Sequence, residues 1–231
     1  VIKMEVVRST IPKNNFLEKV RNLANQRGII LIFDECTSGF RENFGGMHMK
    51  YNVEPDIAMF GKAMGNGYAI TSIIGRRKIM DAAQSTFISS TFWTERIGPS
   101  AALKTLELME REKSWEKITN IGIKISNIWK KLAKKYSLPL ITFGIPALIK
   151  MKFESEFNLE YKTLITQEML KRGYLAGNSV YVCTEHTQEI INEYEKALDE
   201  VFKIISECEQ GKPVSEFLDG PVCYKDFQRL S

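Results

Sequence analysis

Short apolar runs alternate with segments of helical periodicity along the first part of the chain. Residues 1–7 have the pattern of a strand already under way, and the apolar positions of residues 16–24 recur at helical spacing. Residues 29–33 form a continuous, β-branched apolar run, which is typical of a strand buried on both faces, as in a parallel sheet. The order strand, helix, strand predicts a βαβ unit whose second strand delivers Asp34 to its carboxyl end.

A glycine-rich loop follows the next predicted strand. Residues 57–60 and 70–74 are expected to be strands, and residues 61–67 form the loop between them. Lys62 therefore lies just past a strand end, as Asp34 does. Ligands of open α/β sheets gather at the carboxyl ends of the strands, so both side chains are candidates for a site.

The pattern after the glycine loop divides the rest of the chain. It predicts a short helix at residues 77–83 and a polar and aromatic loop at residues 89–94. Two longer helices are expected at residues 98–112 and 115–136. The pattern then predicts a strand at residues 147–153 and a helix at residues 161–172. A second strand at residues 180–183 and a second helix at residues 188–207 follow. We therefore expect part of a large domain over residues 1–136, a small α+β domain over 137–210 and an extended tail over 211–231.

Composition narrows the class of protein. The chain has 231 residues, of which 44% are apolar and 26% are charged, so a packed globular core is expected. The net charge is only +4 and the basic residues are scattered, which gives nucleic-acid binding little support. No apolar run approaches the roughly 18 residues that a membrane span needs, so we expect no membrane segment.

Cysteines, histidines and the first residues add three further expectations. The four cysteines lie far apart without CxxC spacing, which favours reduced thiols and a cytoplasmic setting. The only histidines, His48 and His186, lack ligand spacing, so no metal site is expected. The chain starts within a strand pattern, without Met or a signal peptide. It is therefore expected to be a fragment whose N-terminal part was removed or is separately encoded.

Asp34 and Lys62 suggest a particular chemistry when they are taken together. Singly, each has an ordinary explanation, as a strand-end carboxylate in a cap or salt bridge and as a solvated loop lysine. A lysine amine can form a Schiff base with an aldehyde cofactor, and a carboxylate can keep a pyridine nitrogen protonated. These are the two protein groups that pyridoxal 5'-phosphate needs most. A phosphoacceptor or metal-binding α/β domain would also place acids and a lysine at strand ends, so that alternative stays open.

Three motifs in order resemble one known family. Residues 32–41, 55–57 and 61–67 are similar to the class III aminotransferases, especially their glutamate-1-semialdehyde aminomutase-like branch. The resemblance runs from about residue 1 to about residue 205 and covers the C-terminal half or so of a family member. It implies an α/β protein of the fold type I pyridoxal-phosphate-dependent transferases. The chain would contain part of the large, mostly parallel-sheet domain and a C-terminal α+β small domain.

The resemblance also implies roles for individual residues. Asp34 would pair with the pyridine nitrogen, and Lys62 would form the internal aldimine and then move the proton. Cys36 stands where the family usually has Val against the cofactor ring. Thr91 would reach the cofactor phosphate of the neighbouring subunit in a homodimer, with Thr94 as the alternative.

The implied activity is transfer of an amino group between a small-molecule amino donor and an aldehyde or keto acceptor. An aminomutase, which moves an amino group within one substrate, would use the same residues. The family's phosphate loop and its ring-stacking aromatic residue belong to the N-terminal half, so the cofactor site of this chain alone is expected to be incomplete. A non-catalytic fragment is the remaining alternative.

Overall fold

The chain divides into two compact units. The computed structural model describes residues 1–7, 9–92 and 94–225. The units are Val1–Thr119 and Asn120–Ser231, and the division falls inside the long helix α4 (Ser114–Lys135). The domain limits expected from the sequence stay a prediction. They place the boundary after residue 136, at the end of this helix, whereas the compact units divide after Thr119.

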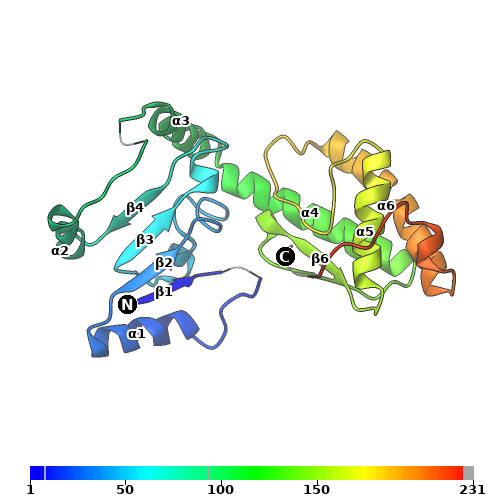
Figure 1. Ribbon diagram of the computed structural model, residues 1–231, viewed down its shortest axis with the longest axis horizontal. Helices are drawn as coiled ribbons and strands as arrows, with labels where there is room; N and C mark the ends of the chain where they lie inside the picture. Colours follow the sequence, from blue (N-terminus) through cyan, green and yellow to red (C-terminus); the bar gives the residue numbers. More distant parts are fainter. Residues whose placement is uncertain (8, 93, 226–231) are drawn as a thin grey trace. The chain divides into compact units, whose positions relative to one another are not determined.

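A four-stranded sheet organises the first unit (Figure 1). Its strands occur in the order β1 (Ile2–Glu5), β2 (Leu31–Asp34), β3 (Ile57–Phe60) and β4 (Ser72–Gly75). The pairs β1–β2 and β2–β3 are parallel, whereas β4 runs antiparallel to β3. The βαβ unit expected at the start of the chain is confirmed, and the sheet is mostly parallel.

Helices and short 3-10 turns lie between these strands and after β4. The helices are α1 (Phe16–Arg27), α2 (Arg77–Met80) and α3 (Ile97–Glu112). The 3-10 turns are η1 (Met47–Tyr51), η2 (Lys62–Met64) and η3 (Asp81–Ser85). Strand β2 and helix α1 contribute fully buried side chains to the core, Leu31 and Phe33 from the strand and Leu17 and Ala24 from the helix.

Asp56 ties helix α1 to the start of strand β2. Its Oδ2 accepts the backbone N–H of Leu31 at 2.8 Å and the Arg21 guanidinium at 2.9 Å. Burial works to raise the pKa of Asp56, but these donors together outweigh it and the pKa is lowered. This buried carboxylate fixes the position of the start of β2 along the strand direction. It thereby also fixes the position of Asp34 at the carboxyl end of β2.

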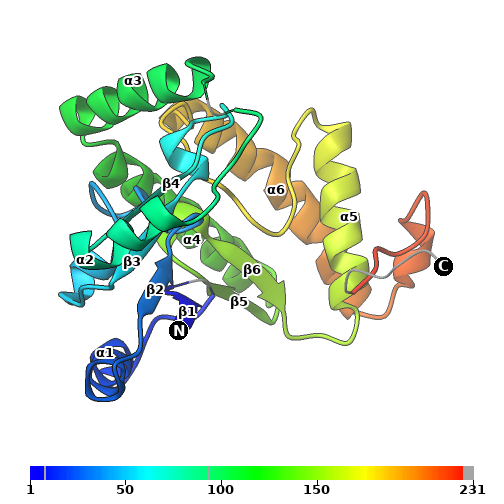
Figure 2. The ribbon, with the colours of Figure 1, turned by 60° about the vertical axis from the view of Figure 1, so that its left-hand side comes forward.

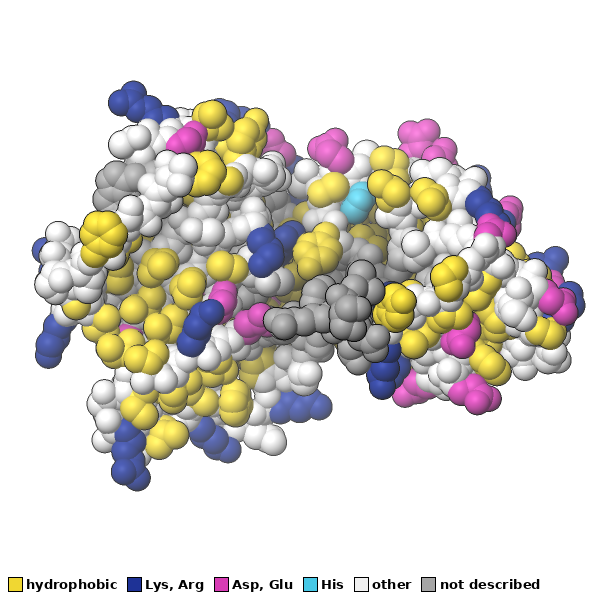
Figure 3. All heavy atoms as spheres, viewed as in Figure 1, with side chains coloured by type: hydrophobic (Ala, Val, Ile, Leu, Met, Phe, Trp, Pro, Cys, Tyr) yellow, Lys and Arg dark blue, Asp and Glu magenta, His cyan; other side chains and the backbone are white. Residues whose placement is uncertain are grey.

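The outer strand β4 has little cover on either face. It pairs only with β3 among the described strands. Ile73 and Ile74 are consecutive, so they point to opposite faces of the sheet, and each is 55% exposed. Hydrophobic side chains are also visible on the surface of this unit in Figure 3.

The second unit combines a two-stranded antiparallel sheet with helices α5 (Asn158–Lys171) and α6 (Gln188–Glu209) and the larger part of α4. The sheet pairs β5 (Leu140–Phe143) with β6 (Lys150–Phe153), and η4 (Pro146–Leu148) lies between them. Helices α5 and α6 lie side by side in Figures 1 and 2. Strand β5 is missing from the sequence prediction, since only four residues separate Pro139 from the turn at Gly144.

The prediction of a strand at residues 180–183 is wrong. The residue before that segment, Ser179, makes one isolated bridge with Lys150 of β6, and the segment itself makes two backbone hydrogen bonds to residues just before β6. The N–H of Val180 donates to Ile149 O at 2.9 Å, and the N–H of Val182 donates to Ala147 O at 3.0 Å. The segment is apolar, but its partners are Ala147 in the 3-10 turn η4 and Ile149 just after it, so no regular ladder forms.

The segment after Gly211 packs against helix α5. It begins with η5 (Val214–Glu216). Gln167 donates from Nε2 to Phe217 O and accepts the N–H of Asp219, both at 2.8 Å. Farther on, the N–H of Cys223 donates to Thr163 Oγ1 at 2.9 Å. The expected extended tail is thus attached to α5 as far as Cys223.

Among the described residues, no helix is both long enough and apolar enough to cross a membrane.

Candidate active site

Asp34 presents an ionised carboxylate at the end of β2. Its Oδ1 accepts the backbone N–H of Cys36 at 3.2 Å, and its Oδ2 lies 3.0 Å from Lys3 Nζ. The hydrogen bond from Lys3 is the main reason that the pKa of Asp34 is lowered, although partial burial opposes it. The Asp34 carboxylate therefore stays charged at neutral pH, and in this structure it accepts the cationic N–H of Lys3.

Lys62 is the second residue beyond the end of β3, directly after Gly61. Its backbone has φ 44°, in the left-handed region that non-glycine residues seldom occupy. Its Nζ donates to Thr37 Oγ1 at 3.1 Å. Asp34 pairs in register with Met59 on the parallel strand β3, so Lys62 emerges three residues beyond the level of Asp34 at the same edge of the sheet.

Cys36 lies close to both of these groups. A Cβ atom on Gly61 would be 3.5 Å from Cys36 Sγ, so the loop backbone passes close to the thiol. Burial raises the pKa of Cys36, the Asp34 carboxylate raises it further, and the positive charge of Lys62 works in the opposite direction. The structure thus brings together three of the residues singled out in the sequence: Asp34, Cys36 and Lys62.

Glu35 faces the interior and forms a cluster that sequence reasoning missed. Its fully buried carboxylate accepts hydrogen bonds from the Ser38 hydroxyl, from the backbone N–H of His48 at 2.9 Å and from His48 Nδ1 at 2.9 Å. The sequence did contain a signal for this burial, because side chains along a strand alternate between the two faces of the sheet. Leu31, Phe33 and Glu35 point to one face, so Glu35 had to be buried and Asp34 did not.

The two candidate threonines stand apart from this group. Thr91 and Thr94 are both exposed in the loop before α3, and Trp93 between them lies outside the described residues. Within that loop, Ser90 Oγ accepts the N–H of Phe92 at 3.2 Å. Neither threonine belongs to the hydrogen-bonded cluster around Asp34 in the part of the chain that the structure describes.

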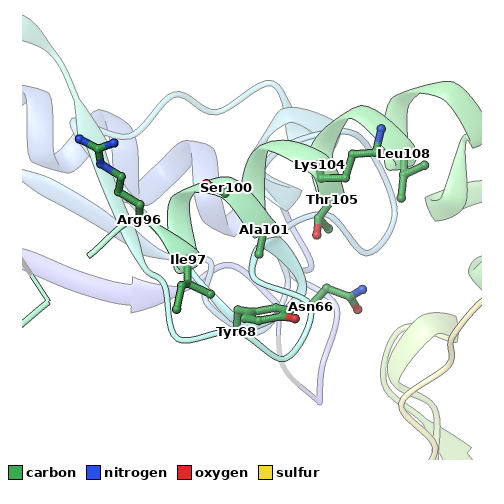
Figure 4. A pocket seen from close by; sticks show the side chains of 9 residues that line it. All are labelled: Asn66, Tyr68, Arg96, Ile97, Ser100, Ala101, Lys104, Thr105 and Leu108. Atoms are coloured by element: carbon green, nitrogen blue, oxygen red, sulfur yellow. The ribbon is translucent and has the colours of Figure 1, made fainter. Parts of the chain in front are cut away.

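A pocket of about 640 Å³ lies beside the glycine loop (Figure 4). Asn66 and Tyr68 line it from the loop that carries Lys62, and the rest of the lining comes from the residue before α3 and from α3 itself. Arg96 and Lys104 are among the lining residues, and the Lys104 ammonium is paired with the Glu107 carboxylate at 2.7 Å. The pocket therefore adjoins the loop that follows Lys62.

The family profile described as "Aminotransferase class-III" matches residues 9–208 of this chain. Among curated proteins, a 3-aminobutyryl-CoA aminotransferase from Cloacimonas acidaminovorans is 37% identical over 188 residues, which are 78% of this chain and 45% of that protein. A glutamate-1-semialdehyde 2,1-aminomutase from Methanococcus maripaludis is 27% identical over 209 residues, which are 83% of this chain and 49% of that protein. The chain thus spans about half the length of the curated relatives it matches.

Solved structures show the same fold. The FumI protein from Sphingopyxis sp. MTA144, solved as its internal aldimine form with pyridoxal phosphate (PLP), aligns with a TM-score of 0.83 at 20% identity. That alignment covers 94% of this chain and 54% of FumI. An omega-transaminase from Sphaerobacter thermophilus aligns with a TM-score of 0.75 at 18% identity, over 84% of this chain and 49% of that protein. The predicted family and fold are confirmed: the chain belongs to the class III aminotransferases and has the fold of the type I PLP-dependent transferases.

Proposed function

We propose that the protein containing this chain is a PLP-dependent aminotransferase. It would move an amino group between a small-molecule amino donor and an aldehyde or keto acceptor. The observation that carries the proposal is the placement of an ionised Asp34 and the Lys62 amine at the ends of adjacent parallel strands, in a chain of this family.

The residues of this edge fit the cofactor chemically. Asp34 already accepts the cationic N–H of Lys3, and a protonated pyridine nitrogen is a donor of the same kind. Lys62 makes its hydrogen bond to a neutral hydroxyl and not to a carboxylate, so its amine is not held in an ion pair there. Cys36 offers a small thiol that packs like an apolar side chain.

Each of these residues would have a distinct task in the reaction. PLP, when bound, supplies an electron sink that stabilises negative charge on the substrate carbon next to the amino group. Lys62 would hold the cofactor through Nζ and later take up and return a proton at that nitrogen. Asp34 would keep the proton on the ring nitrogen, because its carboxylate remains charged throughout the neutral pH range.

The remaining parts of the proposal concern the setting of the site. We propose a homodimer in which Thr91, or alternatively Thr94, reaches the cofactor phosphate of the partner subunit. The exposed polar loop before α3 supports this, since its hydroxyls are available to an anion. We also propose a cytoplasmic setting, which the four free cysteines support.

An aminomutase is the second candidate, because several of the curated relatives carry that name. Both reactions require the same Asp34 and Lys62. Product analysis of the full-length protein, with and without a separate keto acceptor, distinguishes them. An aminotransferase turns over only when the acceptor is present, whereas an aminomutase converts its single substrate without one. Absence of both reactions across a panel of amino donors and acceptors would contradict the proposal.

A further inference from the structure

A buried clamp fixes the turn that follows strand β2. The carboxylate of Glu35 accepts three hydrogen bonds, one from Ser38 and two from His48. The backbone of Glu35 is also fixed, because its N–H donates to Met59 O and its carbonyl accepts the N–H of Gly39, both at 2.8 Å. The residues between Glu35 and Gly39 are therefore held from both ends.

The electrostatics of the clamp favour a charged, fully bonded Glu35. Burial alone would raise the pKa of Glu35, but the hydrogen bonds from His48 and Ser38 together outweigh burial and lower it. A carboxylate can only accept, so His48 Nδ1 carries the hydrogen of this contact. Replacing any of these donors would leave a buried charge incompletely satisfied, which is costly.

Two glycines allow the clamp to close. A Cβ atom on Gly46 would lie 2.3 Å from the His48 ring, and one on Gly39 would lie 2.7 Å from the Phe60 ring and 2.8 Å from Glu35 O. Real Cβ atoms do not approach that closely. The turn is thus built so that the backbone passes directly against the clamp.

Thr37 is the residue that this turn presents to Lys62. It lies between the clamped Glu35 and Ser38, and its Oγ1 accepts the hydrogen bond from Lys62 Nζ at 3.1 Å. Lys62 itself starts from a left-handed backbone conformation behind an extended Gly61. The direction of its side chain therefore depends on that backbone and on the Thr37 hydroxyl.

We propose that Thr37, held in place by the Glu35–His48 clamp, is a positioning residue that aims the Lys62 amine along the edge of the sheet. The inference rests on the proposed function, since it assigns a task to Thr37 in presenting the amine to the cofactor. It adds two elements to the site, a hydroxyl in direct contact with the amine and a buried carboxylate–histidine pair that acts through that hydroxyl.

The test compares Thr37→Val with Thr37→Ser in the full-length protein. Valine keeps the shape of threonine but cannot accept the hydrogen bond, whereas serine restores the hydroxyl. Thr71→Val is the matched control, because Thr71 lies beside Gly61 and is not the acceptor of the Lys62 contact. Two readouts are taken: the rate at which Lys62 captures PLP, trapped with borohydride, and the rate at which trinitrobenzenesulfonate labels Lys62 without cofactor. Both are measured by peptide mass spectrometry.

The two readouts should change in opposite directions. Loss of one ordinary hydrogen bond should slow PLP capture by Thr37→Val about fivefold and speed reagent labelling of Lys62 about fivefold. Thr37→Ser and Thr71→Val should match the parent protein in both. Unchanged rates in Thr37→Val, or equal rate changes in Thr71→Val, would overturn the proposal. If the parent protein captures no PLP at Lys62, the proposed function fails, and the labelling rates still decide the role of Thr37.

The clamp is tested separately through Glu35→Gln. The amide can no longer accept from all three donors, so Lys62 should respond as it does in Thr37→Val. In addition, backbone amides of residues 36–48 should exchange hydrogen faster in Glu35→Gln, whereas Thr37→Val should leave their exchange unchanged. Normal capture and labelling in a folded Glu35→Gln protein would show that the clamp does not act on Lys62.

Discussion

At the residue scale, Asp34 and Glu35 are adjacent acids with different environments. Asp34 is directed to the open edge, where its partners are Lys3 and the N–H of Cys36. Glu35 is fully buried, and its carboxylate accepts hydrogen bonds from Ser38 and His48. The pKa of each is lowered, but only Asp34 is placed to interact with a ligand.

Asp34→Asn should bind PLP and yet turn over slowly. A neutral amide stabilises a proton on the ring nitrogen far less well than a carboxylate does, so proton transfer should slow about a hundredfold, on the order of 3 kcal/mol. Single-turnover kinetics with donor and acceptor measure this directly, and an absorbance titration checks that PLP still binds. Near-normal rates with both substrates would show that Asp34 has only a structural role.

At the element scale, much of the first unit could be predicted from the sequence. Strand β3 and helix α1 could be predicted because their buried positions are apolar at the spacing of a strand and of a helix. The ends of β2 and β3, which carry Asp34 and precede Lys62, were also predicted correctly. The contact between Thr37 and Lys62 could not be predicted, since it depends on how the turn at residues 35–39 folds back and not on any period along the chain.

Helix α5 contains a carboxylate that makes stability depend on pH. Glu168 contacts Lys171 and Arg172, each at 2.8 Å, and Gln167 Nε2 donates to it at 2.9 Å. Burial would raise the pKa of Glu168, but these donors lower it to about 2. The stabilisation is complete above the ordinary Glu pKa of about 4.5 and is lost as pH falls through about 2, with an upper bound of about 3 kcal/mol.

Denaturant titrations of Glu168→Gln should reveal this window. The variant should be less stable than the parent at pH 6, and the difference should shrink by pH 3. Glu160→Gln, in the first turn of the same helix, is the control and should differ little from the parent at either pH. A stability difference for Glu168→Gln that stays constant between pH 6 and pH 3 would contradict the assigned ion pairs.

At the scale of the whole molecule, the chain spans about half the length of its relatives. Its sheet has outer strands β1 and β4, and β4 exposes an isoleucine on each face. The family's phosphate loop and ring-stacking residue, expected in the N-terminal half, were not predicted for this chain. The proposed cofactor site would therefore need groups of the kind that the family places in that half, and its tests use the full-length protein.

Thr91→Ala should weaken cofactor retention more than it slows an enzyme saturated with PLP, because a phosphate contact holds the cofactor and does little chemistry. Equilibrium dialysis of PLP against Thr91→Ala and Thr94→Ala measures the effect, and sedimentation gives the oligomeric state. An unchanged affinity in Thr91→Ala beside a weakened one in Thr94→Ala would move the contact to Thr94. A fully active monomer would refute the cross-subunit contact.

The central claim is that Lys62 is the residue that bonds PLP, and borohydride trapping tests it most directly. The full-length protein is incubated with PLP, reduced and digested, and the modified peptide is identified by mass spectrometry. We expect the adduct on Lys62, and we expect Lys62→Ala to show no adduct and no turnover while it unfolds at the same temperature as the parent. An adduct on a different lysine, or normal turnover in Lys62→Ala, would contradict the account.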